Sequence, residues 1–123
     1  MIKAIHHVSL IVADTARALA FYRDLLGLSC DDARPELGYP GVWLNVAGQQ
    51  IHLLELPNPD PVEGRPEHGG RDRHVAFYVE SLDALKARLT QQHIGYRESR
   101  SGRAAIFCRD PDGNALEFIE PAT

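Results

Sequence analysis

The chain repeats itself, and this repeat is the feature that most constrains its fold. A His-Val pair at His7 opens a short apolar run, and a second pair at His74 opens another, 74 − 7 = 67 residues later. His52 and Glu117 lie in matching apolar runs near the end of each half, 117 − 52 = 65 residues apart. Each follows a turn glycine by four positions, since 52 − 48 = 117 − 113 = 4. Two nearly equal offsets predict two copies of one small module.

Each module is expected to fold as βαβββ, from the period of its apolar residues and from its turn signals. In the first half we expect a strand at 2–12, a helix from the N-cap Asp14 to Leu26 with Gly27 as its stop, and strands at 28–30, 42–47 and 50–56. In the second half we expect a strand at 74–79, a helix capped by Ser81 and stopped near Gly95, and strands at 96–98, 104–109 and 114–120. Asp110-Pro111-Asp112-Gly113 is a strong turn signal between the last two strands.

The 123 residues are expected to form a single domain built from a first module at about 1–57, a linker at 58–73 and a second module at about 74–123. The linker is rich in Pro and Gly, which disfavours a long helix or strand. A four-stranded module cannot bury its sheet alone. The modules must therefore pair with each other or with those of a second chain, and a homodimer is expected in either case.

Composition narrows the partners. A net charge of −4 argues against nucleic acid and against an acidic membrane surface, which leaves a small molecule as the expected ligand. The two cysteines, Cys30 and Cys108, form no CxxC pair, and the N-terminal residues lack the apolar core of a signal peptide. A reduced cytoplasmic location is therefore the expectation.

The four matched residues are the candidate metal ligands. If a pseudo-twofold axis relates the modules, His7, His52, His74 and Glu117 converge on one point. Three imidazoles and a carboxylate suit a divalent Zn, Ni, Mn or Fe ion. A histidine alone in an apolar strand is more often a packed residue, and the matched placement is what favours a metal site here.

Alternation along the strands indicates which other side chains share the ligand faces. Ser9 and Tyr78 share faces with His7 and His74. One of the two alternating sets in residues 42–46 should face the same cavity, and we expect it to be Trp43 and Asn45. Three arginines near the later strands are candidates for holding an anion: Arg97, Arg100 and Arg103. The remaining polar candidates are expected to lie off the ligand faces or in solvent: His6, His68, His93, Glu55 and Glu120.

Several motifs together resemble the vicinal oxygen chelate superfamily, which contains glyoxalase I, methylmalonyl-CoA epimerase, fosfomycin-resistance transferases, extradiol dioxygenases and bleomycin-binding proteins. The resemblance covers the whole chain. It rests on His7-Val8, on Phe21-Tyr22-Arg23-Asp24-Leu25-Leu26-Gly27-Leu28, on Arg73-His74-Val75-Ala76-Phe77, and on Asp110-Pro111-Asp112-Gly113-Asn114 before Leu116-Glu117.

The resemblance implies an α+β fold in which two βαβββ modules pair into a curved mixed-sheet cup with helices outside. It implies one divalent metal ion per site, held by the positions matching His7, His52, His74 and Glu117, whose charge stabilises a developing oxyanion on the substrate. Glyoxalase I-like lyase or isomerase chemistry on a small oxygenated metabolite is the nearest class. Glyoxalase I has an acidic ligand where this chain has His52, so the general base stays open among Glu117, a metal-bound hydroxide and Tyr78.

Three alternatives remain. A metal-free binding protein of the bleomycin-resistance type would use Trp43 and Tyr78 as stacking surfaces. A fosfomycin-type transferase matches His7, Ser9, His74 and Glu117 but has a later arginine that this chain lacks. An extradiol dioxygenase uses two histidines and one glutamate on iron, and a third imidazole from His52 would crowd its open positions.

Overall fold

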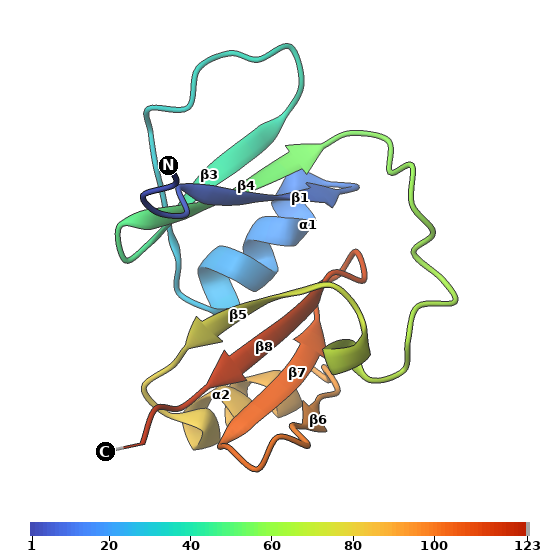
Figure 1. Cartoon of the computed structure of the whole chain (residues 1–123). Coiled ribbons are helices and arrows are strands. Elements are labelled where there is room, and N and C mark those ends of the chain that lie inside the picture. The colour runs from blue at the N-terminus through green and yellow to red at the C-terminus, as the bar shows by residue number, and fades with distance from the viewer. Residues whose placement is uncertain (123) are drawn as a thin grey trace. The chain divides into compact units, whose positions relative to one another are not determined.

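The computed structural model describes residues 1–122. It divides into two compact units, and the boundary in the sequence lies between Asp60 and Pro61. The first unit contains β1 (His7–Val12), α1 (Thr15–Leu19), the π-helix η1 (Ala20–Leu25), β2 (Ser29–Cys30), β3 (Gly41–Val46) and β4 (Gln49–Glu55) (Figure 1). The second unit contains the 3₁₀ turn η2 (Gly69–Arg71), β5 (His74–Tyr78), α2 (Leu82–Gln91), β6 (Arg97–Glu98), β7 (Ala105–Arg109) and β8 (Ala115–Ile119).

The two sheets have the same topology. The strand order is β1-β4-β3-β2 in one unit and β5-β8-β7-β6 in the other. In each, the first strand pairs in parallel with the last, and the remaining pairs are antiparallel. This equivalence confirms the βαβββ repeat that the two matched offsets predict.

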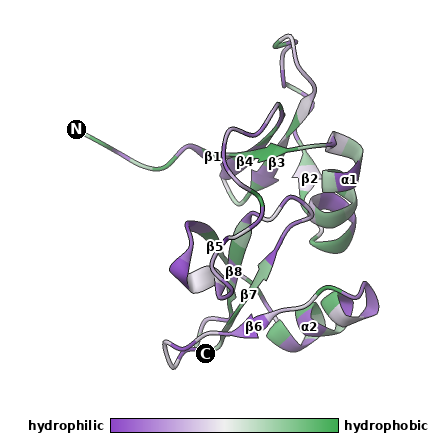
Figure 2. Ribbon diagram, turned by 90° about the vertical axis from the view of Figure 1, so that its right-hand side faces the viewer, coloured by the Kyte–Doolittle hydropathy of each residue, from purple (hydrophilic) through white to green (hydrophobic). Residues whose placement is uncertain are grey.

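Each sheet buries one face beneath its own helix. In the first unit, Leu44, Ile51 and Leu53 point to the buried face and pack with Phe21 and Tyr22 of η1. Figure 2 shows the helical segment and the strands of this unit carrying apolar residues. The second unit repeats the arrangement with apolar side chains from β7, β8 and α2: Ile106, Leu116, Phe118, Leu82, Leu85 and Leu89. Strand alternation therefore leaves the opposite face of each sheet open for polar side chains.

A glutamate at the end of the last strand closes the start of the helix in both units. Glu55 Oε1 accepts a hydrogen bond from the Thr15 backbone N–H at 2.7 Å, and Glu120 Oε1 accepts one from Leu82 at 2.8 Å. Asp14 and Ser81 also cap these helices, as their sequence positions predict. Free N–H groups and positive dipole charge at a helix N-terminus favour a carboxylate there. The two glutamates thus have a structural role off the ligand faces.

Two expected boundaries are wrong. The first strand begins at His7 rather than at residue 2, because pairing with β4 starts at Gln50 and residues 1–6 have no strand partner. The first helix keeps its expected extent to within a residue, from Thr15 to Leu25, but it passes into a π-helix at Ala20. The second helix ends at Gln91, ahead of Gly95, because His93 adopts a left-handed φ of +58°.

Asp72 anchors the linker to the turn between β7 and β8. Its carboxylate accepts hydrogen bonds from Arg65 Nη2 at 2.6 Å and from Arg109 Nη1 at 2.8 Å, and its side chain is 6% exposed. Arg109 also donates to the carbonyl of Gly113 at 2.7 Å. The Arg65 hydrogen bond, followed by those of Arg109 and the Arg73 backbone, holds the pKa of Asp72 well below its usual range despite the opposing effect of burial. This network fixes the linker directly before His74.

Both cysteines are free thiols, so the two modules are not linked by a disulfide between Cys30 and Cys108. None of the helices formed by residues 1–122 is both long enough and apolar enough to cross a membrane.

Candidate metal and substrate site

In the first unit, three aromatic side chains gather on the open face of the sheet. Register places Ser9 of β1 and Trp43 of β3 on either side of His52 in β4. The His52 ring stacks on His7, with 3.9 Å between ring centroids and 15° between planes, and on Trp43, at 4.4 Å and 7°. His52 is buried while His7 is exposed. The pattern of alternating residues thus brings His7, His52 and Trp43 together, with Ser9 exposed on the same strand face.

The polar partners of His52 determine its tautomer. Gln50 Nε2 donates to Asp31 Oδ2 at 2.7 Å, which directs Gln50 Oε1 to His52 Nε2 at 2.8 Å. An amide oxygen accepts only, so Nε2 carries the hydrogen and Nδ1 keeps its lone pair. Burial, and then the nearby charges of His7 and His6, lower the pKa of His52. His52 is therefore a neutral imidazole at neutral pH, which is the form that binds metals.

In the second unit, His74 faces Glu117 across the start of the sheet. His74 Nδ1 lies 2.9 Å from the backbone carbonyl oxygen of Asp72, and its Nε2 lies 3.3 Å from Glu117 Oε1. Because a carbonyl oxygen only accepts, Nδ1 carries a hydrogen and Nε2 is the nitrogen presented to the carboxylate. At this distance Nε2 and the carboxylate oxygen can share a hydrogen or can both bind one cation.

Glu117 is almost completely buried, with its side chain 3% exposed. Its second oxygen, Oε2, accepts a hydrogen bond from Arg103 Nη2 at 3.0 Å. Removing a carboxylate from water is costly unless it is paired. Arg103 supplies one partner, and Oε1 is left facing His74.

The second pair of candidate ligands fits a metal ion. Ligand distances of about 2.0–2.2 Å at a tetrahedral centre put neighbouring nitrogen and oxygen ligands about 3.3 Å apart, close to the His74–Glu117 distance. A ring N–H donated to a backbone carbonyl is also the usual support of a metal-binding histidine. The stacked rings of His7 and His52 lie face to face instead, so the exposed His7 ring must turn before a nitrogen lone pair from each ring can point at one ion.

Among residues 1–122, no three His, Cys, Asp or Glu side chains gather closely enough to hold a metal ion. Each unit brings together two of the four matched ligands, His7 with His52 and His74 with Glu117. The convergence of all four on one ion stays a prediction.

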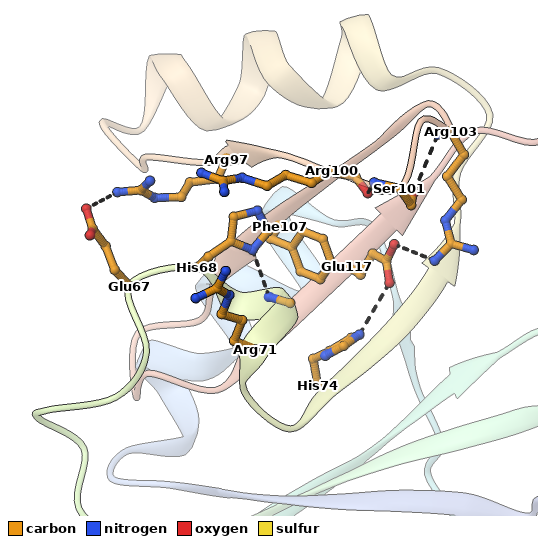
Figure 3. Close-up of a pocket in the computed structure, with 12 residues that line it drawn as sticks. Glu67, His68, Arg71, His74, Arg97, Arg100, Ser101, Arg103, Phe107 and Glu117 are labelled. Atoms are coloured by element: carbon orange, nitrogen blue, oxygen red, sulfur yellow. Dashed lines mark hydrogen bonds and ion pairs between the residues drawn. The ribbon is translucent and has the colours of Figure 1, made fainter.

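A pocket of about 500 Å³ opens beside the His74–Glu117 pair and lies wholly within the second unit (Figure 3). Phe107 of β7 shares the sheet face with Glu117 through their register, and its ring packs against His68 with centroids 5.0 Å apart. Most of the lining residues are polar or charged, and they come from the end of the linker, from the segment 97–103 and from strands β5, β7 and β8: Glu67, His68, Gly70, Arg71, His74, Arg97, Ser99, Arg100, Ser101, Arg103, Phe107 and Glu117.

Of the substrate-binding candidates, Arg103 lines this pocket and contacts Glu117. The neighbouring Arg97 and Arg100 also line the pocket. Tyr78 is 78% exposed at the end of β5 and is not a lining residue. Sequence reasoning missed Phe107, which parity with Glu117 could have found.

It also missed the inner part of the linker, His68 to Arg71. Glycine allows this close packing, because a Cβ at Gly70 would come within 3.0 Å of His68 Nδ1 and 3.2 Å of Phe107 Cζ. No periodic pattern in the linker indicates this contact, so no sequence signal marks His68 or Arg71.

The chain has clear relatives. The model of the Glyoxalase/Bleomycin resistance protein/Dioxygenase superfamily matches residues 4–118. Uncharacterized protein YwkD of Bacillus subtilis is 34% identical, over 98% of this chain and 98% of that protein. Glyoxylase I 4 of Arabidopsis thaliana is 30% identical, over 94% of this chain and 69% of that protein. The crystal structure of a putative glyoxalase family protein from Bacillus anthracis superposes with a TM-score of 0.81 at 28% identity, covering 99% and 98% of the two chains. The chain therefore belongs to this superfamily.

Proposed function

We propose that this member of the superfamily is a metal-dependent enzyme with glyoxalase I-like lyase or isomerase chemistry. His7, His52, His74 and Glu117 would hold one divalent ion, and its substrate would be a small oxygenated metabolite. The observation that carries the proposal is the His74–Glu117 pair, whose Nε2 and Oε1 face each other at 3.3 Å while Nδ1 is held by a carbonyl. When bound, the ion would supply positive charge that stabilises an oxyanion developing on the substrate.

The protein groups divide the remaining work. Arg103 holds Oε2 of Glu117, so a proton moving to or from this carboxylate would use Oε1, the oxygen on the His74 side. Glu117 is the first candidate for the general base, and Oε1 would have to leave the ion before it could accept a proton. Tyr78 ranks below it, because its side chain is exposed and is not part of the pocket lining. Gln50 keeps the His52 ring in one tautomer and is a positioning residue.

The superfamily relatives support the proposal that this protein is an enzyme, but they do not agree on one reaction. Lactoylglutathione lyase of Haemophilus influenzae, human mitochondrial methylmalonyl-CoA epimerase and metallothiol transferase FosB of Shouchella clausii are 27–30% identical to this chain. Their names describe three different reactions. The lyase comes first in our proposal because it is 30% identical and this chain spans 90% of its length.

The test begins with the full chain stripped by EDTA and then loaded separately with Ni²⁺, Zn²⁺, Mn²⁺ or Fe²⁺. We expect at least one ion to raise the melting temperature and to restore lactoylglutathione turnover that EDTA abolishes. Loss of a metal ligand should weaken binding of that ion more than the roughly 10–100-fold found for groups that only orient a ligand.

His74→Ala and His68→Ala form a matched pair, because both remove a histidine that lines the same pocket. We expect His74→Ala to lose the metal and the activity, and His68→Ala to retain the metal. A protein that gains no stability from any of the four ions, or a His74→Ala variant that binds them normally, would contradict the proposal. Metal binding without lactoylglutathione turnover would refute the lyase assignment alone.

A metal-free binding protein is the second candidate, and the stack of His7, His52 and Trp43 favours it. In this stack His52 Nε2 is engaged by Gln50, and the two histidine rings lie parallel instead of pointing at one ion. The half-buried Trp43 ring would then extend a flat surface for a planar ligand. The EDTA experiment separates the two candidates, because a metal-free binder should melt at the same temperature with and without chelator.

A further inference from the structure

We propose that the pocket of the second unit binds an oxyanion group of the substrate, a carboxylate or a phosphate, through Arg71 and Arg100. The inference deepens the proposed function by naming a substrate class. It rests on that function only for the reacting end of the substrate at His74 and Glu117. Binding of the anion can be measured without any metal.

The pocket has an excess of positive charge. Four arginines line it, and two carboxylates, Glu67 and Glu117, accompany them. Arg97 forms an ion pair with Glu67, and Arg103 forms one with Glu117. Within residues 1–122, Arg71 and Arg100 form no ion pair with a protein carboxylate, so two guanidinium groups remain for a ligand.

Local hydrogen bonds hold the two segments that carry the unpaired arginines. Arg71 is the last residue of η2, where the Gly70 N–H donates to His68 Nδ1 and the Arg71 N–H donates to the His68 carbonyl. Arg100 lies between two serines whose hydroxyls are 2.8 Å apart, and Ser101 Oγ also accepts from the backbone N–H of Arg103. Figure 3 shows the two arginines entering the pocket from different segments, with the Phe107 ring between them and Glu117.

The rest of the pocket suits the body of a small organic anion. Phe107 offers an apolar ring beside the arginines, and the volume of about 500 Å³ is in the range of small-molecule sites. Guanidinium groups recognise carboxylate and phosphate with paired hydrogen bonds. A ligand anchored by Arg71 and Arg100 would lie over Phe107 and reach toward the His74–Glu117 pair.

The probes are benzoate, phenyl phosphate and the neutral benzamide, which share a ring that can contact Phe107. We would titrate each into the full chain in EDTA, and again with metal, by calorimetry or by NMR shifts of the pocket amides. We expect both anions to bind more tightly than benzamide at constant ionic strength. The tighter of the two identifies whether the natural group is a carboxylate or a phosphate.

Arg71→Gln and Arg100→Gln are the test variants, and Arg23→Gln is the matched control because Arg23 is exposed in the other unit. Each test substitution should weaken anion binding about tenfold, the equivalent of one lost charge-assisted hydrogen bond, and the control should not weaken it. Three results would each overturn the proposal: equal binding of benzamide and the anions, no binding of either anion, or unchanged anion binding when Arg71→Gln and Arg100→Gln are combined in one variant. Because these titrations include metal-free protein, they can succeed where the metal test fails, and the reverse.

Discussion

The Asp72 network offers the sharpest test of how the linker is held next to His74. Asp72→Asn keeps the side-chain shape but replaces one acceptor oxygen with a donor that faces arginine N–H groups. Hydrogen bonds to charged groups contribute about 1.5–3 kcal/mol each. Arg65 and Arg109 are partly exposed, so in the variant their guanidinium groups can hydrogen-bond to water, which reduces the lost free energy of folding. We expect a net destabilisation of about 2 kcal/mol, or a melting temperature about 7 °C lower for a chain of this size.

The pH dependence gives this prediction a second arm. The folded-state pKa of Asp72 is lowered, so its stabilising contribution is complete above the pKa of an unfolded aspartate, about 3.9. That contribution is lost as pH falls through the lower folded-state pKa. The difference in melting temperature between wild type and Asp72→Asn should therefore be full at pH 7 and shrink below about pH 4.

Thermal and urea unfolding would be followed by circular dichroism in EDTA, so that bound metal does not contribute. Asp32→Asn is the matched control, because Asp32 is an exposed aspartate in the other unit, and it should melt within about 2 °C of wild type. If Asp72→Asn melts as wild type does at pH 7, the Asp72 hydrogen bonds do not stabilise the fold. If the difference persists unchanged to pH 2.5, the ionised carboxylate of Asp72 is not its source.

Three smaller predictions follow from other contacts. Glu55→Ala and Glu120→Ala should each lower the free energy of unfolding by about 1 kcal/mol by removing a helix-capping acceptor, and the corresponding Gln variants should lose less, as measured in urea. Burial raises the pKa of Cys108 to about 12, so this thiol should resist iodoacetamide at pH 8 in the folded protein while the other cysteine reacts, as read by peptide mass spectrometry. Gly113→Ala should cost about 1–2 kcal/mol, because φ there is +83°, whereas Gly95→Ala, with open space and no positive φ, should be nearly neutral in the same urea assay.

The fold could be predicted because the repeat supplies two independent readings of the same module. Strand alternation and turn glycines place seven of the eight strands within one or two residues of their observed bounds. The first strand is the exception, since its apolar extension at Ile2 and Ile5 is exposed and has no partner. The pattern of residue types shows which residues could form a strand, while pairing with a neighbouring strand decides where the strand begins.

The candidate site was predictable where it depends on which face of a strand a side chain occupies. Parity puts Trp43 in one of two alternating sets and separates Glu117 from the capping Glu120, and the β3–β4 register then brings Trp43 against His52. The wall formed by His68 and Arg71 was not predictable, because it depends on how a Pro- and Gly-rich segment packs against Phe107. Contacts of this kind arise from tertiary packing and leave no period in the sequence.

The proposed metal site requires that the two modules supply ligands to one and the same metal ion. The direct measurement is metal content and affinity per chain, by elemental analysis and competitive titration, for variants taken from each module: His52→Ala from the first, and His74→Ala and Glu117→Gln from the second. We predict one ion per chain, and each of the three substitutions should weaken its binding by more than about 100-fold. Normal metal affinity in His52→Ala, or no stoichiometric metal in the wild type, would show that the modules do not share one metal ion.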